Sequence, residues 1–439
     1  MPFCGKALPV GSVSVNQMTY QTIQQQLDKG WRVFDPNRLT FLRQVLQWVG
    51  QPDQALTIIQ IAGTNGKGST GAMLREVLHA HGETVGHFAS PAVFNDREQI
   101  WLNGQFVTET AWVAAYEQLH DALNRHDRTI AALSYFEVWT IVALLVFQAE
   151  HVTYAIMEAG LGGRDDATHM VGQAAVVAYT EIGLDHQNIL GQTLAEIAQN
   201  KADLITPGAR VVSDLTQPDE VLTILKATTA AKQATWAAQP VAVDVKQDTP
   251  AGLVVSVAGE RYQLGLVGAF QRRNLGVVWQ ILAALETRDQ LRIDVATRRR
   301  GLAQAHMLGR MQVDPERHIL WDGAHNEDAT QGLVATLKNW ALPERPILVL
   351  GVLADKNYQQ MLNLLLPLVS AVITVTPNNP RALSADALAK TVQAVAAEMP
   401  VTVMDQEPLA YAIAQRTSPS QYIIVAGSFY TLNAVGGFS

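Results

Sequence analysis

The sequence has almost no cysteine: Cys4 is the single one in 439 residues. One cysteine cannot form an internal disulfide, which excludes the cross-linked scaffold of a small secreted protein and favours a cytoplasmic location. Long hydrophobic runs are missing too, because the longest nearly uncharged apolar stretch, residues 138–147, is too short to span a bilayer. No charged segment followed by an apolar run opens the chain, so we expect neither a secretion signal nor a place in a membrane.

The chain also has fewer basic than acidic residues. The formal net charge is -8 and the isoelectric point is near 5.8. Nucleic acid and anionic membranes call for a basic protein face, so both are excluded as main partners. With 48% apolar residues and a length beyond the size at which one core stops growing, the chain predicts two domains.

What the sequence does have is a glycine-rich turn between two regular elements. Residues 58–70 are IIQIAGTNGKGST, in which the first apolar residues predict a strand buried on both faces and the end leads into a helical pattern. Glycines let backbone N–H groups approach an anion, the helix N-terminus adds partial positive charge, and Lys67 adds a full one. Ser69 then offers a hydroxyl to Mg²⁺. Ile61 and Gly68 depart from the common P-loop spelling, but the strand and helix around the turn indicate a nucleotide phosphate site.

Two further predicted strands end in residues that could contact a ligand or a metal ion. Residues 84–89 lead into Ser90 and a proline, which release the chain into a loop where α/β sheets place ligand contacts. Residues 152–157 end at Glu158, and three glycines follow within residues 160–163. A carboxylate there is placed like the acidic Mg²⁺ partner of a phosphate loop. The alternative for Glu158 is a cap or salt bridge beside a flexible turn.

Another predicted strand, residues 174–180, leads to Asp185 and His186. This pair suits a metal-binding histidine held by a carboxylate, although such a histidine is more often only hydrogen-bonded at a surface. Lys201 lies among apolar residues of the predicted helix 194–205. Burial would lower the pKa of its amine and suit it to become a nucleophile or a modified ligand. The alternative, which the sequence alone favours, is a lysine that reaches out to solvent.

The second half of the chain changes pattern twice. Residues 240–266 form short runs of alternating apolar and polar residues, which predict a small antiparallel sheet. A predicted boundary near residue 297 then divides the chain into domains 1–296 and 297–439. Strands and helices then alternate, which predicts a parallel-sheet domain of Rossmann type that closes on the first domain across a nucleotide. Its expected strands are residues 317–322, 346–352, 370–376, 400–404 and 421–427, with polar ends at Asp322, His325, Asn326, Asp355, Lys356, Arg381 and Ser428.

The predicted fold class is therefore α/β. It combines an N-terminal P-loop-type parallel-sheet ATP-binding domain, which carries the small antiparallel sheet, with a C-terminal Rossmann-like α/β domain.

Ten short motifs follow one another along the chain: GTNGKGS (63–69), SP (90–91), EAGLGGR (158–164), IGLDH (182–186), LGQTLAEIAQNKA (190–202), GR (309–310), DGAHN (322–326), ADK (354–356), PRAL (380–383) and GSFY (427–430). In this order they resemble the folylpolyglutamate synthases and dihydrofolate synthases of the Mur ligase superfamily, over nearly the whole chain. The resemblance implies an ATP-dependent ligase that adds L-glutamate to a folate. In that chemistry a substrate carboxylate attacks the γ-phosphate of ATP, and the amine of glutamate displaces phosphate from the resulting acyl phosphate.

The resemblance also implies roles for individual residues. Contacts to ATP fall to Thr64, Asn65, Gly66, Lys67, Gly68, Ser69, Asn274, Arg310 and Asp322, and catalytic roles to Lys67, Lys201 and His325. Two Mg²⁺ ions are implied, one on Ser69 and Glu158 and one on His186 and a carbamylated Lys201. Contacts to the folate or dihydropteroate and to L-glutamate fall to Ser90, Asp166, Lys356, Arg381 and Ser428. We expect a monomer.

The chain departs from the family pattern at several positions. The residues concerned are Glu98, Gln99, Asp165, His169, Asn200, Asp203, Phe270, Met307 and Leu308. We expect these changes to cluster near the pterin and the second metal rather than near ATP. The resemblance therefore leaves two acceptors open, because some relatives extend existing folates while others also add the first glutamate to dihydropteroate.

Two other classes of function stay open from the sequence. One is a related ligase with another acceptor, such as a peptidoglycan precursor, although the short first domain leaves little room for the extra domain that grips a uridine nucleotide. The other is a nucleotide-binding protein without turnover, either an ATPase or a divergent paralogue. Asn200 and Asp203 keep it open, whereas the presence of four residues opposes it: Lys67, Glu158, His186 and Lys201.

Overall fold

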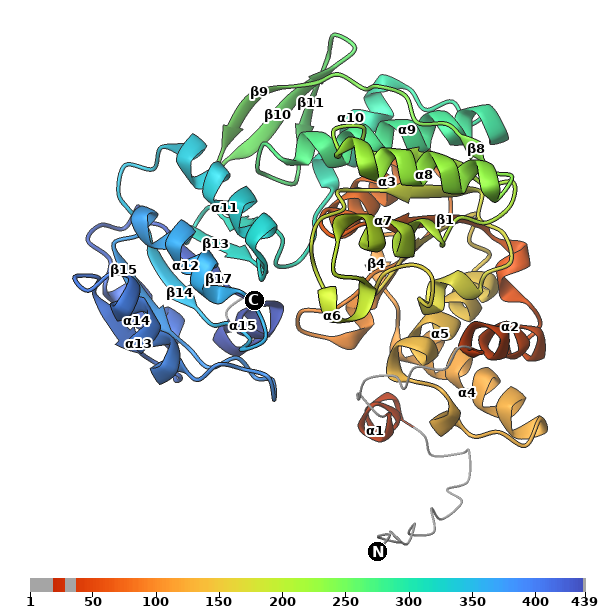
Figure 1. Cartoon of the computed structure of the whole chain (residues 1–439), viewed down its shortest axis with the longest axis horizontal. Coiled ribbons are helices and arrows are strands. Elements are labelled where there is room, and N and C mark those ends of the chain that lie inside the picture. The colour runs from red at the N-terminus through yellow and green to blue at the C-terminus, as the bar shows by residue number, and fades with distance from the viewer. Residues whose placement is uncertain (1–18, 28–36, 437–439) are drawn as a thin grey trace, which may run out of the picture.

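The computed structural model describes residues 19–27 and 37–436 and forms two lobes, each built on its own β-sheet (Figure 1). An eight-stranded sheet organises the first lobe and a six-stranded sheet the second, while a three-stranded sheet lies above the junction in this view. Cys4 lies outside the described residues. Within the described residues, no helix is long and apolar enough to cross a membrane.

The large sheet has the strand order β4-β3-β2-β5-β1-β6-β7-β8. Its central strand β1 (Thr57–Ala62) confirms the predicted buried strand, because Ile58 faces one hydrophobic core and Ile59 the opposite one. The strands parallel to it are β2 (Val85–Phe88), β5 (Tyr154–Glu158), β6 (Val176–Tyr179), β7 (Arg210–Ser213) and β8 (Thr235–Trp236). An antiparallel extension that the sequence did not predict is formed by β3 (Ile100–Leu102) and β4 (Gln105–Phe106).

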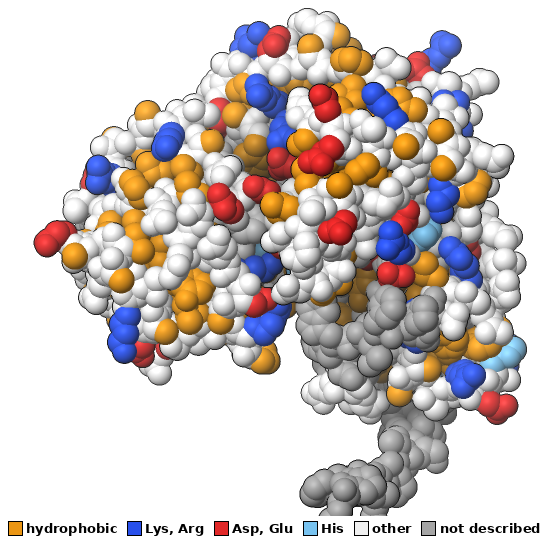
Figure 2. Space-filling view, viewed as in Figure 1, with side chains coloured by type: hydrophobic (Ala, Val, Ile, Leu, Met, Phe, Trp, Pro, Cys, Tyr) orange, Lys and Arg blue, Asp and Glu red, His pale blue; other side chains and the backbone are white. Residues whose placement is uncertain are grey.

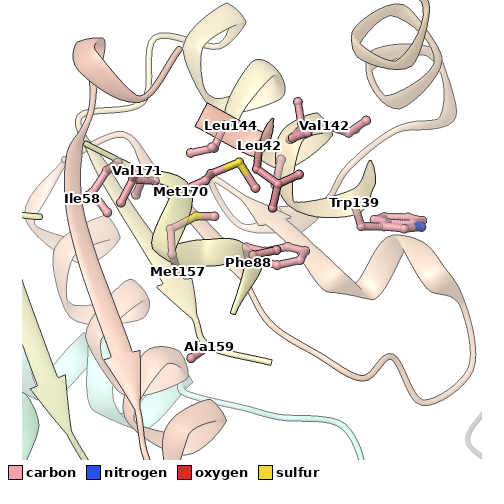
Figure 3. Close-up of a cluster of buried hydrophobic side chains, with 14 of the residues drawn as sticks. Leu42, Ile58, Phe88, Trp139, Val142, Leu144, Met157, Ala159, Met170 and Val171 are labelled. Carbon is pink, nitrogen blue, oxygen red and sulfur yellow. The ribbon is translucent and has the colours of Figure 1, made fainter. Parts of the chain in front are cut away.

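Helices cover both faces of this sheet, as two buried cores require. One face carries α3 (Lys67–His81), α9 (Gln271–Asp289) and α10 (Val295–Gln304), which pack on one another. The other carries α2 (Arg38–Trp48), α4 (Glu109–Arg125), α5 (Tyr135–Ala149), α7 (Leu194–Ala202) and α8 (Asp219–Ala231), with the short α1 (Tyr20–Gln26) and α6 (Gln187–Leu190) beside them. Figure 3 shows Trp139 and Val142 of α5 in the core that also contains Phe88 and Met157 of the sheet.

The small sheet consists of β9 (Val243–Thr249), β10 (Gly252–Val257) and β11 (Glu260–Leu264) and is antiparallel, as predicted. Its strand β9 contacts α9 of the first lobe and α11 (Glu327–Trp340) of the second. Asp248 on β9 joins the two sides, since one carboxylate oxygen accepts from the Ala269 amide at 2.9 Å and the other from the Trp340 indole at 3.0 Å. The small sheet therefore braces the junction between the lobes.

The second lobe has the strand order β12-β13-β17-β14-β15-β16. All five predicted strands are present and parallel, as β13 (Ile319–Asp322), β14 (Ile347–Leu350), β15 (Ala371–Thr374), β16 (Val401–Val403) and β17 (Ile423–Ala426). The sheet is mixed rather than wholly parallel, because β12 (Gln312–Asp314) adds an antiparallel edge. Its helices are α11, α12 (Tyr358–Leu365), α13 (Ala385–Val395), α14 (Pro408–Ala414) and α15 (Phe429–Val435).

The boundary between the two predicted domains remains a prediction. Residue 297 lies inside α10, which packs on α3 and β11, whereas the next strand along the chain, β12, belongs to the sheet of the second lobe.

Candidate active site

The glycine-rich turn joins β1 to α3 with the strand-turn-helix geometry that the sequence predicts. Gly66 caps the helix with a left-handed φ of 87°, and a Cβ there would lie 2.1 Å from the Asn274 side-chain oxygen, so only glycine fits. Lys67, the first helical residue, folds back and donates from Nζ to the carbonyl oxygens of Gly63 at 3.0 Å and Thr64 at 3.3 Å. Burial lowers the pKa of Lys67, while the Glu158 carboxylate raises it in part.

A cavity of about 100 Å³ opens between this turn, α9 and the second lobe. Seven residues predicted to contact ATP line it together: Asn65, Gly66, Gly68, Ser69, Asn274, Arg310 and Asp322. They come from the phosphate turn, α9, the loop before β12 and the carboxyl end of β13, so the fold gathers residues more than 250 positions apart in the chain, as Gly66 and Asp322 are. Figure 2 shows charged side chains along the junction of the lobes.

The cavity joins a polar wall to an apolar one. Arg310 lies 4.3 Å from the ring centroid of Phe429, and burial lowers the pKa of its guanidinium. Asp322 accepts from the backbone amides of Met311 at 2.8 Å and Ala324 at 2.9 Å, and burial raises the pKa of its carboxyl. The apolar wall consists of Phe270, Met311, Ala329 and Leu333.

Two of the departures from the family pattern lie beside the predicted ATP residues. Phe270 lines the cavity, and Met307 covers the phosphate turn so closely that a Cβ on Gly68 would lie 2.1 Å from its Cε. The expectation that the departures cluster away from the ATP side therefore does not hold for these two residues.

Glu158 stands at the carboxyl end of β5 and is only 2% exposed. Its Oε1 lies 3.0 Å from Nε2 of His87, a buried residue of the neighbouring strand β2. Burial lowers the pKa of His87 although Glu158 favours its charged form. His87 is a site residue that the sequence analysis missed; a histidine in the middle of a buried strand was the available signal.

Lys201 projects from α7 toward the phosphate turn. It is 4% exposed and donates from Nζ to the Gly63 carbonyl at 2.9 Å, the same oxygen that Lys67 contacts. The interpretation that this lysine reaches out to solvent is therefore wrong. Burial, followed by the nearby charge of Lys67, lowers the pKa of Lys201 to about 7, so a large share of the amine is neutral near neutral pH.

Asp185 connects the two lobes at the edge of the site. Its Oδ1 lies 3.2 Å from Nζ of Lys356, and its Oδ2 accepts from the Asn326 amide at 3.3 Å. Burial alone would raise the pKa of Asp185, but His186, Lys356 and His325 together hold it down at about 2. The carboxylate is therefore charged throughout the physiological range and ties the first lobe to the second.

We expect Lys356→Met to loosen this connection. Hydrogen bonds to charged groups contribute roughly 1.5–3 kcal/mol, and the lower value is expected because Asn326 still donates to Asp185. Hydrogen exchange of the backbone amides of residues 183–186 should speed up accordingly, while Lys338→Met, at an exposed position of α11, should leave it unchanged. Unchanged exchange in Lys356→Met would mean that the pair does not hold the lobes together. The depressed pKa makes the contribution of Asp185 constant above about pH 4 and lost as the pH falls through about 2.

The two histidines near this bridge differ in environment. His186 caps α6 with a left-handed φ of 51°, and its Nε2 lies 3.8 Å from Asp185 Oδ2. Burial lowers its pKa, although Asp185 opposes the shift. His325 binds the Gly323 carbonyl through Nδ1 at 2.8 Å, and burial together with Lys356 lowers its pKa to about 4. His325 is therefore neutral at physiological pH.

Four residues predicted to contact the substrates hold structural positions instead of lining the described cavity. Asp166 caps a turn and accepts from the amides of Leu161 and Thr168, and Ser428 caps α15 by accepting from the Thr431 amide. Arg381 pairs with Asp355 at 2.8 Å, and Ser90 precedes a cis proline. Their roles toward substrate remain predictions.

Two departures fix the glycine-rich turn after Glu158 onto α7. Asn200 accepts from the Gly163 amide at 3.1 Å, and Asp203 pairs with Arg164 at 2.6 Å. Both side chains therefore already have partners within the first lobe.

The candidate metal ligands suit Mg²⁺ that is held partly by water and substrate phosphates, rather than a metal ion held by protein side chains alone. Among the described residues, no group of three or more His, Cys, Asp and Glu side chains is placed to hold a metal ion. Mg²⁺ commonly uses one or two carboxylates, waters and substrate phosphates. Oε2 of Glu158 accepts no hydrogen bond from the described residues, and Oε1 would lie 3.4 Å from a Cβ on Gly68, the residue before Ser69 at the start of α3, which suits that chemistry.

The comparisons with known proteins give this site a class. The Mur ligase middle domain matches residues 61–279, and the Mur ligase glutamate ligase domain matches residues 309–429. The two-lobed fold with a phosphate turn facing the second lobe is thus that of an ATP-dependent ligase, as predicted.

Individual relatives narrow the class to a family. The chain is 32% identical over 408 residues to the dihydrofolate synthase/folylpolyglutamate synthase of Bacillus subtilis. The alignment covers 90% of this chain and 93% of the relative. The crystal structure of Mycobacterium tuberculosis folylpolyglutamate synthase complexed with ADP and AMPPCP matches with a TM-score of 0.82 and 27% identity, over 94% of this chain and 97% of that one. The bifunctional folylpolyglutamate synthase/dihydrofolate synthase of Yersinia pestis, complexed with AMPPNP and a Mn ion, matches with a TM-score of 0.80 and 26% identity, over 94% and 96%. The chain belongs to the folylpolyglutamate synthase/dihydrofolate synthase family.

Proposed function

We propose that this protein joins L-glutamate to a folate, using ATP and passing through an acyl phosphate. The observation that carries the proposal is the gathering of seven predicted ATP residues around one cavity between the lobes, with Lys67 and Lys201 converging on the Gly63 carbonyl beside it. Closure of two lobes over ATP would exclude water and bring the carboxylate and the amine together.

The phosphate end of the reaction is assigned to the first lobe. Amides of the turn and the start of α3 would cradle the ATP phosphates, and Lys67 and Arg310 would neutralise the charge that develops on the transferred γ-phosphoryl group. Both cations already sit in low-exposure surroundings, where their charge acts more strongly than it does in water. Asn274 and Asp322 would orient the rest of the nucleotide, and His325, neutral at physiological pH, would lie near its base or phosphates.

We propose two divalent cation sites. Ser69 and Glu158 would hold the first Mg²⁺, and His186 with a carbamylated Lys201 the second. Bound Mg²⁺ supplies positive charge that polarises the phosphoryl oxygens. The lowered pKa of Lys201, about 7, supports the carbamate, because only a neutral amine adds to CO₂.

The acceptor side is assigned to the edge where the lobes meet. Lys356 and Arg381 would bind glutamate carboxylates, Ser428 would act on the same side, and Ser90 with Asp166 would contact the folate. The protein would act in the cytoplasm, for which the single cysteine is the support, and as a monomer. Addition of the first glutamate to dihydropteroate is a second candidate activity, favoured by the bifunctional relative from Bacillus subtilis.

Phosphate release with ATP, Mg²⁺ and glutamate tests the proposal. We expect release that stops when glutamate is left out and that matches, one for one, the amide product measured by mass spectrometry. Tetrahydrofolate and dihydropteroate are compared as acceptors: activity with both means a bifunctional enzyme, and activity with tetrahydrofolate alone means a chain-extending synthase. Folded protein that binds ATP but accepts neither would overturn the folate assignment.

A further inference from the structure

Glu158 belongs to a chain of three side chains that starts at the half-buried Arg75 of α3 and runs through the buried His87. Arg75 of α3 reaches Nδ1 of His87 at 3.4 Å from its NH1, and Nε2 of His87 reaches Glu158 Oε1 at 3.0 Å. The side chain of His87 has no exposed surface and that of Glu158 is 2% exposed, so solvent does not compete for these contacts. The role proposed for Glu158, as a ligand of the first divalent cation, does not require Arg75 or His87.

The order of donors and acceptors along this chain is fixed at both ends, because the Arg75 guanidinium only donates and the Glu158 carboxylate only accepts. A guanidinium has only donors, so Nδ1 of His87 must accept, and in the neutral ring the proton then sits on Nε2. Nε2 therefore donates to Glu158 Oε1. Oε2 of Glu158 accepts no hydrogen bond from any described residue, which leaves one lone-pair-rich oxygen for another ligand.

Arg75 is itself held in place from several directions. Its guanidinium carbon lies 4.7 Å from the ring centroid of Trp101, Nε pairs with Glu76 at 3.2 Å, and NH2 donates to the His306 carbonyl at 3.0 Å. A guanidinium fixed by these contacts presents its donor to His87 without further ordering. Packing around α3 thus supports the proton position on His87 that the Glu158 carboxylate also requires.

The helix makes room for this arrangement at Gly71. A Cβ at that position would lie 2.3 Å from His87 Nε2 and 3.3 Å from Glu158 Oε1. Glycine inside a helix is less stable than alanine, and here it leaves the space that the imidazole occupies between strand and helix. Sequence, packing and hydrogen bonding therefore agree on one orientation for Glu158.

We propose that His87 is a positioning residue for the metal ligand Glu158, with Arg75 fixing His87 as the Nε2-protonated tautomer. This inference rests on the proposed function only in taking Glu158 as a ligand of the first divalent cation. The hydrogen bond occupies Oε1 and would leave Oε2 for the cation, so that one carboxylate oxygen would serve the protein and the other the metal.

The tautomer is tested on the wild-type protein without metal. Two-bond ¹H–¹⁵N correlation spectra of ¹⁵N-histidine-labelled protein distinguish the tautomers, and His87→Gln identifies the signals by their disappearance. We expect the Nε2-protonated pattern in wild type and in Glu158→Leu, where Arg75 alone still requires Nδ1 to accept, and a mixture of tautomers in the double variant Arg75→Met/Glu158→Leu. An Nδ1-protonated His87 in wild type would overturn the inference, and so would a wild-type pattern in the double variant.

The positioning role is tested by titrating Mn²⁺ into protein saturated with ADP and following free Mn²⁺ by electron paramagnetic resonance. Removal of such a hydrogen-bond partner typically weakens metal binding about 10- to 100-fold, which we expect for His87→Leu. His87→Gln keeps a donor at the position of Nε2 and should stay near wild type. Glu158→Gln separates the two ideas: wild-type affinity in that variant would remove the proposed metal site itself. Weak binding in Glu158→Gln with wild-type affinity in His87→Leu would overturn the positioning role alone.

Discussion

Lys67→Ala should lower kcat for glutamate-dependent phosphate release by about 100- to 1000-fold, the loss typical of removing one group that stabilises developing charge. The side chain lies at the start of α3, and its amine is already directed at the turn that would cradle the phosphates. Because the side chain is half-buried and desolvation lowers its pKa, its charge acts more strongly than it would in water. We expect weaker ATP binding as well, measured by calorimetry.

The fold should survive this change. The Gly63 carbonyl keeps a donor in Lys201 Nζ at 2.9 Å, so the truncation leaves that buried acceptor satisfied. Lys338→Ala, an exposed lysine of α11, is the matched control and should keep full activity. A Lys67→Ala enzyme with kcat within a few-fold of wild type would show that the turn does not act on the transferred phosphate.

The parts of the fold that the sequence predicted are those with continuous apolar runs. β1 and the strands β13, β14 and β17 of the second lobe are buried, and burial on both faces leaves a pattern in the sequence. β12 and the β3–β4 extension were not predicted. β12 is three half-buried residues, Gln312–Asp314, that pair only with β13, and neither their polarity nor their length distinguishes them from a loop. Edge strands of this kind are decided by the neighbour they pair with.

The site was predictable where polar residues follow buried strands, because parallel strands deliver their carboxyl ends to one edge of a sheet. Glu158 and Asp322 were found in this way. His87 was missed because its partner Glu158 stands 71 positions away and pairs with it across neighbouring strands. A cap and a ligand also look alike in a sequence: Ser428 was predicted to contact substrate, and its hydroxyl caps α15. Such choices depend on distances that no local pattern contains.

Lys201→Ala should remove nearly all ligase activity, by about 100-fold or more, if its carbamate holds the second metal and so stabilises the transferred charge. A neutral amine adds to CO₂ to form a carbamate and releases one proton, and the pKa of about 7 makes that amine available near neutral pH. The alanine variant loses the carboxylate but gains space at a buried position. Formate or acetate should then restore part of the activity as its concentration rises.

Lys201→Met is the matched control, since it fills the space and should show no rescue. At a fixed pressure of CO₂, wild-type activity should also rise as the pH increases through about 7, because the amine becomes neutral in that range. The rescued alanine variant needs no amine and should lack this step. If no small acid restores activity and removal of CO₂ leaves the wild type unchanged, the carbamate is wrong, while glutamate-dependent phosphate release would still establish the ligase. The two results separate a modified lysine from a buried cation that acts directly on the phosphates beside Lys67.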